Sequence, residues 1–359
     1  MSYKKDTPYN DLPLLPPDSK KWESIEIYKS LSEARAALAE LKGRCPVIPN
    51  PMMLINTLVM QEAKDSSSIE NIFTTSDKLY RAFASAKPDP DTQTKEVIRY
   101  RQATLDAWSK LQKNDISLKL IVNIFKQIKE AKDAEGIRDE AVYIGNAMKT
   151  IYTPPCRKKV LTEKLENWVE YANKNDGLDP LIKMAILHYQ FEAIHPFTDG
   201  NGRTGRVMNV LFISKKGLLD KPVLYLSKYI NEYKNDYYRL LKEVTENGNW
   251  ADWILYMLKG VKETSVHTLQ KVNDIYDLYK STVEKVKKEA NDIYSYELIE
   301  MLFNQPYCKI SFLVDAGIAS RNTASKYLGR LVEIGVLSKE QSGSESLYLN
   351  KELFKILSK

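Results

Sequence analysis

The sequence predicts a mainly α-helical protein with one small β-hairpin and a winged helix-turn-helix at its C-terminal end. Apolar residues recur at helical spacing over most of the chain, for example in SLSEARAALAELKG at 30–43, where the final glycine supplies a helix stop. The segment 142–155 breaks this spacing with β-branched and aromatic residues around a Gly-Asn pair, which favours a hairpin. Three short helical patterns and a Gly/Ser-turned hairpin after residue 291 are typical of a winged helix.

The composition limits the class of protein. The 359 residues are 43% hydrophobic and 28% charged, which is ordinary for a soluble globular protein of two or three compact units. No apolar run approaches the roughly 18 residues of a membrane helix, and the opening MSYKKDTPYNDLPLLPP lacks the apolar centre of a signal peptide, so we expect a cytoplasmic protein without membrane contact. Cys45, Cys156 and Cys308 have no metal-ligand spacing and are expected to be free thiols. A net charge of +6 neither demands nor excludes a nucleic-acid partner.

The elements can be placed in order along the chain. Residues 1–20 carry PLLPP and few apolar residues at helical spacing, which indicates an extended surface arm. Asp179 and Pro180 suit the start of a helix over 179–194 that is apolar on most faces, so we expect it to run through the middle of its domain. Further helices are expected at 30–43, after IPNP, and at about 93–113, 117–131, 161–174 and 228–260. The predicted domains are an N-terminal arm with helices (1–95), a core (96–260), a charged connector helix (261–291) and the winged helix (292–359).

The most informative stretch is HPFTDGNGRTGR at 195–206, which leaves the apolar helix, turns through glycines and enters the next helix. Glycines let backbone N–H groups converge, and the positive end of a helix dipole adds to them, so the turn predicts a phosphate site. Arg203 and Arg206 share a helix face and suit a polyphosphate. Asp199 is a hard oxygen ligand for Mg²⁺ between phosphate oxygens. His195, with an ordinary pKa of about 6.5, suits a general base.

A purely structural interpretation of this stretch stays open, because a Gly-Asn-Gly turn between two helices is common. Against it, a base, a metal ligand, a glycine turn and two arginines fall within twelve residues. The coincidence favours a nucleotide site.

At these residues the sequence resembles the Fic family, whose signature is His-x-Phe-x-Asp/Glu-Gly-Asn-Gly-Arg-x-x-Arg. HPFTDGNGRTGR matches that signature at every defined position. The segments LPLLPP, ALAELKG, IPNP, SSSIEN, IGNAMKTIYTPP and WADWILYMLKGV, and the C-terminal tail, also resemble multi-domain bacterial Fic proteins. The resemblance therefore covers nearly the whole chain and implies a Fic-type helical bundle with a hairpin flap.

The resemblance also implies a protein adenylyltransferase. His195 would take a proton from a Ser, Thr or Tyr hydroxyl of a target protein or of the chain itself, AMP would pass from ATP to that oxygen, and pyrophosphate would leave. Asp199 would bind Mg²⁺, with Mn²⁺ as an alternative, and Phe197 would anchor the loop. The ATP-binding residues that it implies are Glu70, His195, Gly200, Asn201, Gly202, Arg203, Thr204, Gly205, Arg206, Tyr237 and Tyr238. For either tyrosine, a core position on a helix is an equal alternative.

Two other segments gain a role from the resemblance. The flap residues Ile144, Gly145, Thr150, Ile151 and Tyr152 would pair with an extended target segment, although a structural hairpin is the alternative. SSSIEN fits the inhibitory pattern Ser/Thr-x-x-x-Glu-Gly/Asn through Ser66, Glu70 and Asn71. This pattern implies that Glu70 pairs with Arg206 and blocks the γ-phosphate position. The alternative is a local capping box formed by Ser67 and Glu70.

The remaining candidates have weaker signals. His188 and His267 are expected to be structural, and Glu192 to orient or cap. The start of the expected recognition helix, with Arg321, Asn322, Thr323 and Lys326, could contact DNA or dock a protein. Two other functions stay open, namely AMP removal with Glu70 activating water, and DNA-binding regulation with a nucleotide sensor. The oligomeric state, including a homodimer, is also open.

Overall fold

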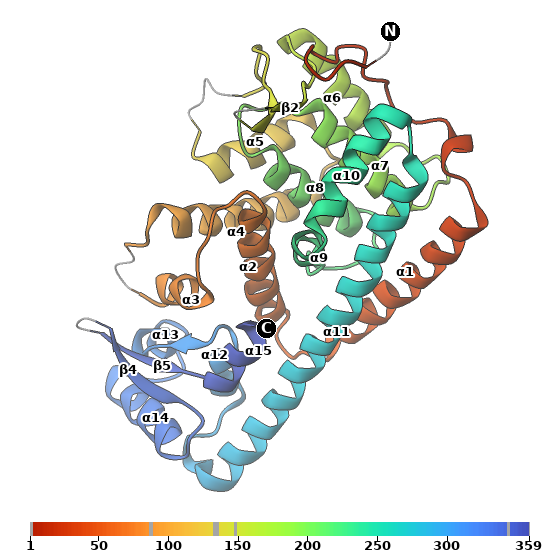
Figure 1. The fold of residues 1–359 in the computed structure, drawn as a ribbon. Coiled ribbons are helices and arrows are strands. Elements are labelled where there is room, and N and C mark those ends of the chain that lie inside the picture. The colour runs from red at the N-terminus through yellow and green to blue at the C-terminus, as the bar shows by residue number, and fades with distance from the viewer. Residues whose placement is uncertain (1–2, 86–88, 132–135, 147–148, 343–344, 359) are drawn as a thin grey trace.

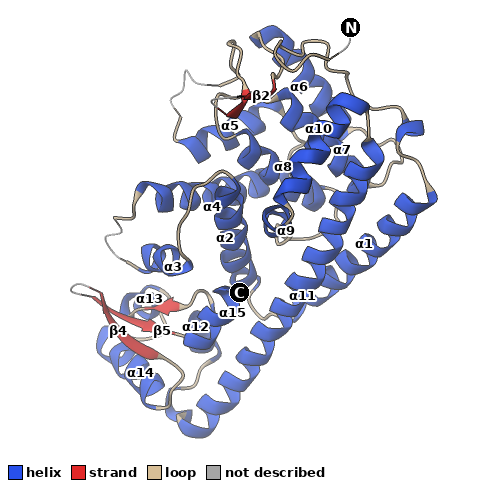
Figure 2. Ribbon diagram, in the orientation of Figure 1, coloured by secondary structure: helices blue, strands red, loops and turns tan. Residues whose placement is uncertain are grey.

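The computed structural model of the protein describes residues 3–85, 89–131, 136–146, 149–342 and 345–358. Helices dominate, as predicted, and they form a bundle that a single long helix joins to a smaller C-terminal unit (Figures 1 and 2). No helix in these ranges is long and apolar enough to cross a membrane. The three cysteines are free thiols, as expected.

The joining helix is α11 (Trp250–Glu289), which spans 40 residues without a break and packs along α1 (Ile25–Arg44) (Figure 1). Residue 261, where a separate connector was expected to begin, lies inside this helix. Gly260 does not interrupt it. A Cβ atom at Gly260 would lie 2.7 Å from the Tyr229 ring, so the glycine serves close packing of α9 (Leu226–Glu232).

The centre of the bundle is formed by α7 (Pro180–Ile194) and α8 (Asn201–Lys215), which are buried at nearly every position. Asp179 caps α7 by accepting the N–H of Leu181 at 2.8 Å, and Pro180 occupies its first turn, as predicted. The helices that pack on them include α4 (Thr92–Leu111), α5 (Leu118–Lys129), α6 (Lys158–Asn173) and α11, while α10 (Lys234–Asn247) packs on α9 and α11. The 195–206 stretch therefore joins two helices fixed by the core.

Helix α2 (Pro51–Ile69) approaches α8 from the side of the C-terminal unit and brings the SSSIEN segment to it. Its anchor is Glu62, whose carboxylate accepts hydrogen bonds from the backbone N–H and hydroxyl of Ser227. The capping-box alternative is wrong, because Ser67 and Glu70 lie at the C-terminal end of α2 rather than at a helix start. Glu70 itself follows the last helical residue.

The predicted hairpin consists of β1 (Ile144–Asn146) and β2 (Lys149–Tyr152), which pair antiparallel. The Gly145-Asn146 pair, around which the hairpin was expected, belongs to β1, and residues 147–148 lie outside the described residues. The Tyr152 hydroxyl donates to the Ala193 carbonyl at 2.8 Å, which fixes the hairpin against the end of α7. The N-terminal arm lies beside the end of the hairpin, where the Tyr9 N–H donates to the Thr153 carbonyl at 3.1 Å.

The C-terminal unit contains a three-stranded sheet with the order β3-β5-β4. Its elements are α12 (Tyr296–Phe303), β3 (Tyr307–Cys308), α13 (Ile310–Asp315), α14 (Arg321–Glu333), β4 (Ser338–Ser342), β5 (Glu345–Leu349) and α15 (Lys351–Ser358). The predicted helices and strands are present, and the Gly/Ser turn at 343–344 lies outside the described residues. Helix α15 packs on α2 and α11. On the bundle side, α3 (Ser76–Ala84) contacts the sheet through an ion pair between Arg81 and Glu340.

Candidate functional site

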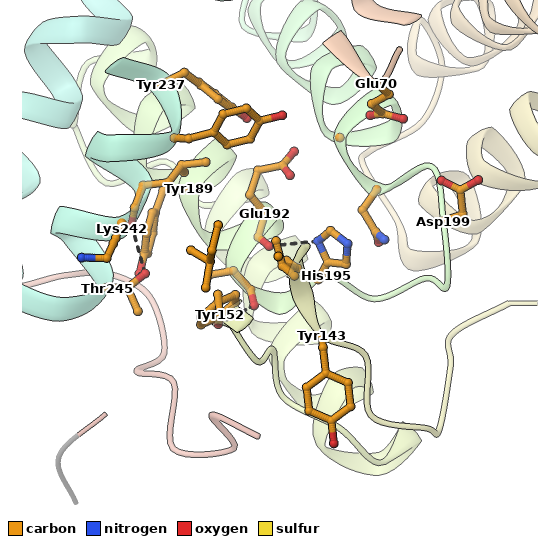
Figure 3. A pocket seen from close by; sticks show the side chains of 18 of the residues that line it. Glu70, Tyr143, Tyr152, Tyr189, Glu192, His195, Asp199, Tyr237, Lys242 and Thr245 are labelled. Atoms are coloured by element: carbon orange, nitrogen blue, oxygen red, sulfur yellow. Dashed lines mark hydrogen bonds between the residues drawn. The ribbon is translucent and has the colours of Figure 1, made fainter. Parts of the chain in front are cut away.

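A cavity of about 650 Å³ opens where the 195–206 stretch, the hairpin and α10 meet (Figure 3). It brings together residues that the sequence leaves far apart. Of the predicted residues, the cavity is lined by Glu70, Ile144, Gly145, Ile151, Tyr152, His195, Asp199, Gly200, Asn201, Gly202, Arg206, Tyr237 and Tyr238. Thr150 belongs to β2 but does not line the cavity.

The loop between α7 and α8 is held rigidly by its own side chains. Phe197 is fully buried and stacks on Phe125 with 4.0 Å between the ring centroids, so it anchors the loop as expected. The Asn201 side chain accepts from the Phe197 N–H and donates to the Phe197 carbonyl, both at 2.8 Å. The amide is therefore used in shaping the loop. Asn201 also lines the cavity, so phosphate binding at this residue stays a prediction.

The glycines let the first turn of α8 face the cavity. Gly200 adopts a left-handed conformation with φ 75°, and a Cβ atom at Gly202 would lie 2.6 Å from both Arg206 Nη1 and Glu70 Oε1. N–H groups at the start of a helix then point to where an anion can bind. Arg203, Thr204 and Gly205 do not line the cavity, and ATP binding by these three residues stays a prediction. The Thr204 hydroxyl donates to the Gly200 carbonyl at 2.9 Å, and Gly205 faces Glu192.

The side chain of His195 is neutral and could therefore accept a proton. Burial, reinforced by the nearby Arg138 guanidinium, lowers the pKa of His195 to about 4. Its Nδ1 lies 3.3 Å from the Glu192 carbonyl, which can only accept, so Nδ1 carries the proton and Nε2 has the free lone pair (Figure 3). Arg138 Nε donates to the His195 carbonyl at 2.8 Å and holds the backbone at this left-handed residue.

Glu70 forms ion pairs with both arginines of the stretch. Its Oε1 lies 2.8 Å from Arg206 Nη2, as the inhibitory pattern implies, and its Oε2 lies 2.6 Å from Arg203 Nε. Ser66 completes the contact, because Arg206 Nε donates to its hydroxyl at 2.7 Å. Burial acts to raise the pKa of Glu70, but the Arg206 and Arg203 charges outweigh it and keep this pKa below its ordinary value. The carboxylate is therefore ionised at neutral pH.

Asn71 has a backbone role in the inhibitory pattern. It is exposed and left-handed, with φ 62°, and its N–H donates to the Ser68 carbonyl at 3.1 Å. Glycine and asparagine tolerate this conformation best. The Gly/Asn position of the pattern thus ends α2 directly after Glu70.

Sequence reasoning missed two charged residues next to the metal candidate Asp199. Lys129, at the end of α5, lies 2.6 Å from Asp199 Oδ2, and its ammonium is also 3.0 Å from Glu96 Oε1 on α4. Glu96 in turn pairs with Arg203. No local pattern marks Glu96 or Lys129, since only the packing of α4 and α5 on α8 brings them here.

The donor set around Asp199 decides which metal it suits. Within the described residues, no group of three or more His, Cys, Asp or Glu side chains could enclose a metal ion. A lone carboxylate fits Mg²⁺, which retains water and takes its other ligands from substrate phosphates.

The other candidates divide into core and cavity positions. Tyr237 is 2% exposed and its hydroxyl lies 3.0 Å from His188 Nε2, so both are largely structural. Tyr238 is 49% exposed and faces the cavity. Among the residues that the structure describes, the buried Oε1 atom of Glu192 has no hydrogen-bond partner, and burial raises the pKa of this carboxyl to about 7. His267 bonds to Lys228 at 2.8 Å, far along α11.

Comparison with known proteins gives three consecutive family matches. Residues 28–109 match the Fic/DOC family N-terminal model, residues 114–213 the Fic/DOC family, and residues 278–353 the C-terminal domain described as protein adenylyltransferase SoFic-like. Protein adenylyltransferase fic-1 of Caenorhabditis briggsae is 30% identical over 151 residues, which are 41% of this chain and 27% of that relative. Protein adenylyltransferase Fic of Drosophila yakuba is 30% identical over 153 residues, 42% of this chain and 28% of that relative. The chain thus spans little more than a quarter of these relatives' length.

Solved structures share the fold. A Fic family protein from Desulfovibrio desulfuricans G20 superposes with a TM-score of 0.58 and 17% identity, covering 93% of this chain and 98% of that one. Fic-1 from Caenorhabditis elegans superposes with a TM-score of 0.51 and 21% identity, covering 68% and 71%. The chain thus carries Fic/DOC family domains over residues 28–109 and 114–213, with the complete signature in its cavity.

Proposed function

We propose that this chain transfers AMP from ATP to a hydroxyl side chain of a protein, and that Glu70 keeps it autoinhibited. The observation that carries the proposal is a neutral histidine, His195, at the edge of a preformed anion site in one cavity. The names of the relatives favour AMP transfer over AMP removal and over DNA-binding regulation. The residue roles below rest on the geometry of the cavity.

In the proposed reaction His195 Nε2 takes the proton of a Ser, Thr or Tyr hydroxyl. The freed oxygen attacks the α-phosphorus of ATP, the bond from that phosphorus to the bridging oxygen of the β-phosphate breaks, and pyrophosphate leaves. The first N–H groups of α8, at Gly202 and its neighbours, hold phosphate oxygens. Asp199 would hold Mg²⁺, which neutralises charge on the α and β phosphates when bound. The hairpin edge at Ile151 would align the target segment.

Autoinhibition follows from the position of the Glu70 carboxylate. Arg206, 2% exposed, is the arginine suited to the γ-phosphate, and Glu70 and Ser66 use its Nε and Nη2 donors. A triphosphate would have to displace an ionised carboxylate from two guanidinium groups. The resting enzyme is therefore assembled but cannot bind ATP productively.

The test is incorporation of label from α-labelled ATP into the protein or into extract proteins. Glu70→Gly and the isosteric Glu70→Gln should raise labelling roughly tenfold or more, because losing about 1.4 kcal/mol of the blocked state shifts the equilibrium tenfold. Unchanged labelling in both variants would rule out the autoinhibitory role. Adding His195→Ala to Glu70→Gly should abolish labelling while nucleotide binding persists, and activity that survives it would remove His195 as the base.

A further inference from the structure

The carboxylate of Asp199 is already occupied by cations of the protein itself. Its Oδ1 accepts the Gly200 N–H at 2.6 Å and lies 3.3 Å from Arg203 Nη2. Its Oδ2 lies 2.6 Å from the ammonium of Lys129. Both oxygens that a metal ion could use are thus engaged.

Lys129 is held in this place by its packing. Its side chain is 25% exposed, and its Cγ and Cδ atoms would lie 3.2 Å from a Cβ atom at Gly200, so the methylenes cross the bare glycine backbone. The ammonium has a second acceptor in Glu96 Oε1, 3.0 Å away and on another helix. The ammonium of Lys129 therefore lies between the carboxylates of Asp199 and Glu96 rather than in solvent.

We propose that Lys129 is a positioning residue. In the resting enzyme its ammonium occupies the position on Asp199 that a divalent metal ion would take, and it moves to Glu96 when the metal–nucleotide complex binds. The inference rests on the proposed function, because it takes Asp199 as the metal ligand. A divalent cation on Asp199 and an ammonium 2.6 Å from the same carboxylate would repel each other. Glu96 gives the ammonium an anionic partner that it already contacts, so withdrawal needs only a small movement.

The exchange is linked to the autoinhibitory contact through Arg203. This arginine pairs with Glu70, Glu96 and Asp199, so one guanidinium touches the inhibitory carboxylate, the acceptor for Lys129 and the metal ligand. Release of Glu70 leaves Arg203 to pair with Glu96 and Asp199 alone. The metal site is therefore best measured in the Glu70→Gly background.

The experiment measures Mn²⁺ binding without turnover. Electron paramagnetic resonance would give the dissociation constant of Mn²⁺ from Glu70→Gly protein saturated with an ATP analogue whose α–β bridge is a methylene. Lys129→Met keeps the methylenes over Gly200 and removes the charge, so Mn²⁺ should bind about fivefold more tightly, the effect of removing a competing ion pair worth about 1 kcal/mol. Lys119→Met, an exposed lysine on the same helix, should leave the constant unchanged and controls for net charge.

A double-mutant comparison identifies the route of the effect. In an Asp199→Asn background, Lys129→Met should cause no further change, because the competed ligand is gone. Unchanged or weaker Mn²⁺ binding by Lys129→Met would overturn the proposal, and weaker binding would assign Lys129 to the nucleotide phosphates. Lys129→Gln serves in the same way if the methionine variant unfolds. Mn²⁺ binding is measured without AMP transfer. If Lys129→Met does not tighten Mn²⁺ binding but the Glu70→Gly protein still incorporates label, this proposal fails and the proposed function stands.

Discussion

At the scale of single residues, the pKa of His195 lies well below the ordinary value for a histidine. Burial and Arg138 lower its pKa to about 4, so the imidazole is neutral over the whole physiological range. A base must be unprotonated to accept a proton, so activity should be lost only as the pH falls through the lowered pKa.

The pH profile tests this directly. For Glu70→Gly protein, the acid limb of kcat/KM attributable to His195 should lie near pH 4, and the rate should change little between pH 5.5 and 7.5. Initial rates of AMP incorporation at saturating metal would measure it, with unfolding followed in parallel. An acid limb of the profile near pH 6.5 would show that the His195 side chain is exposed to water in the nucleotide-free protein.

The sequence predicts the residues of this site that are close together in the chain, and few of the others. HPFTDGNGRTGR contains the proposed base, metal ligand and anion site, because a loop between two helices keeps its residues adjacent. The ion pair between Glu70 and Arg206 could be predicted only from the family resemblance, because the two residues are far apart in the chain. The contacts of Arg203 with Glu96, and of Lys129 with Asp199, depend on three helices meeting, so no spacing in the sequence announces them.

At the scale of elements, a buried carboxyl links α2 to α9. Glu62 is 3% exposed and bonds to Ser227 at the start of α9, and burial raises its pKa to about 7. A raised pKa means that the folded state keeps a proton that the unfolded chain has lost. The stabilisation is complete below the ordinary pKa of 4.5 and is lost as the pH rises through about 7.

Glu62→Gln should remove this dependence. Between pH 4.5 and 8 the wild type should lose on the order of 3 kcal/mol of unfolding free energy relative to the variant, from a shift of about 2.5 pKa units. Urea unfolding at several pH values would measure the difference. Parallel curves for the two proteins would show that Glu62 is ionised in the folded state.

Element boundaries were predicted where caps and breakers act locally. Asp179 and Pro180 start α7, as their residue types predict. The expected break near residue 261 is absent because Gly260 packs against Tyr229 instead of ending the helix. Helix α15 was not predicted, because a segment of eight residues is too short for its apolar spacing, Leu353 and Leu357, to decide between helix and loop.

At the scale of the whole molecule, α15 ties the C-terminal unit to the helix that carries Glu70. Leu353 and Leu357 are fully buried, and the Leu357 carbonyl accepts a hydrogen bond from Gln61 of α2. The Tyr307 hydroxyl donates to Asp77 Oδ1 at 2.5 Å and adds a second contact with α3. DNA or protein binding by Arg321, Asn322, Thr323 and Lys326 on α14 stays a prediction.

Leu357→Ala should therefore destabilise more than the C-terminal unit. A fully buried leucine cut to alanine costs about 2–5 kcal/mol, and because its neighbours include α2, the bundle should melt with it. Thermal unfolding followed by circular dichroism would measure the loss, with the exposed Lys355→Ala on the same helix as the control. A variant that lost only a small early transition would indicate that the C-terminal unit folds independently.

The unbroken α11 fixes the geometry between the two parts of the protein. Its 40 residues form a rod about 60 Å long, and α1 stiffens the bundle end by packing along it. A protein bound by the C-terminal unit would be held at a fixed distance and orientation from the cavity. A flexible linker would instead allow many distances and orientations. For the proposed transferase, this fixed span would make target choice depend on molecular reach as well as on contacts at the hairpin.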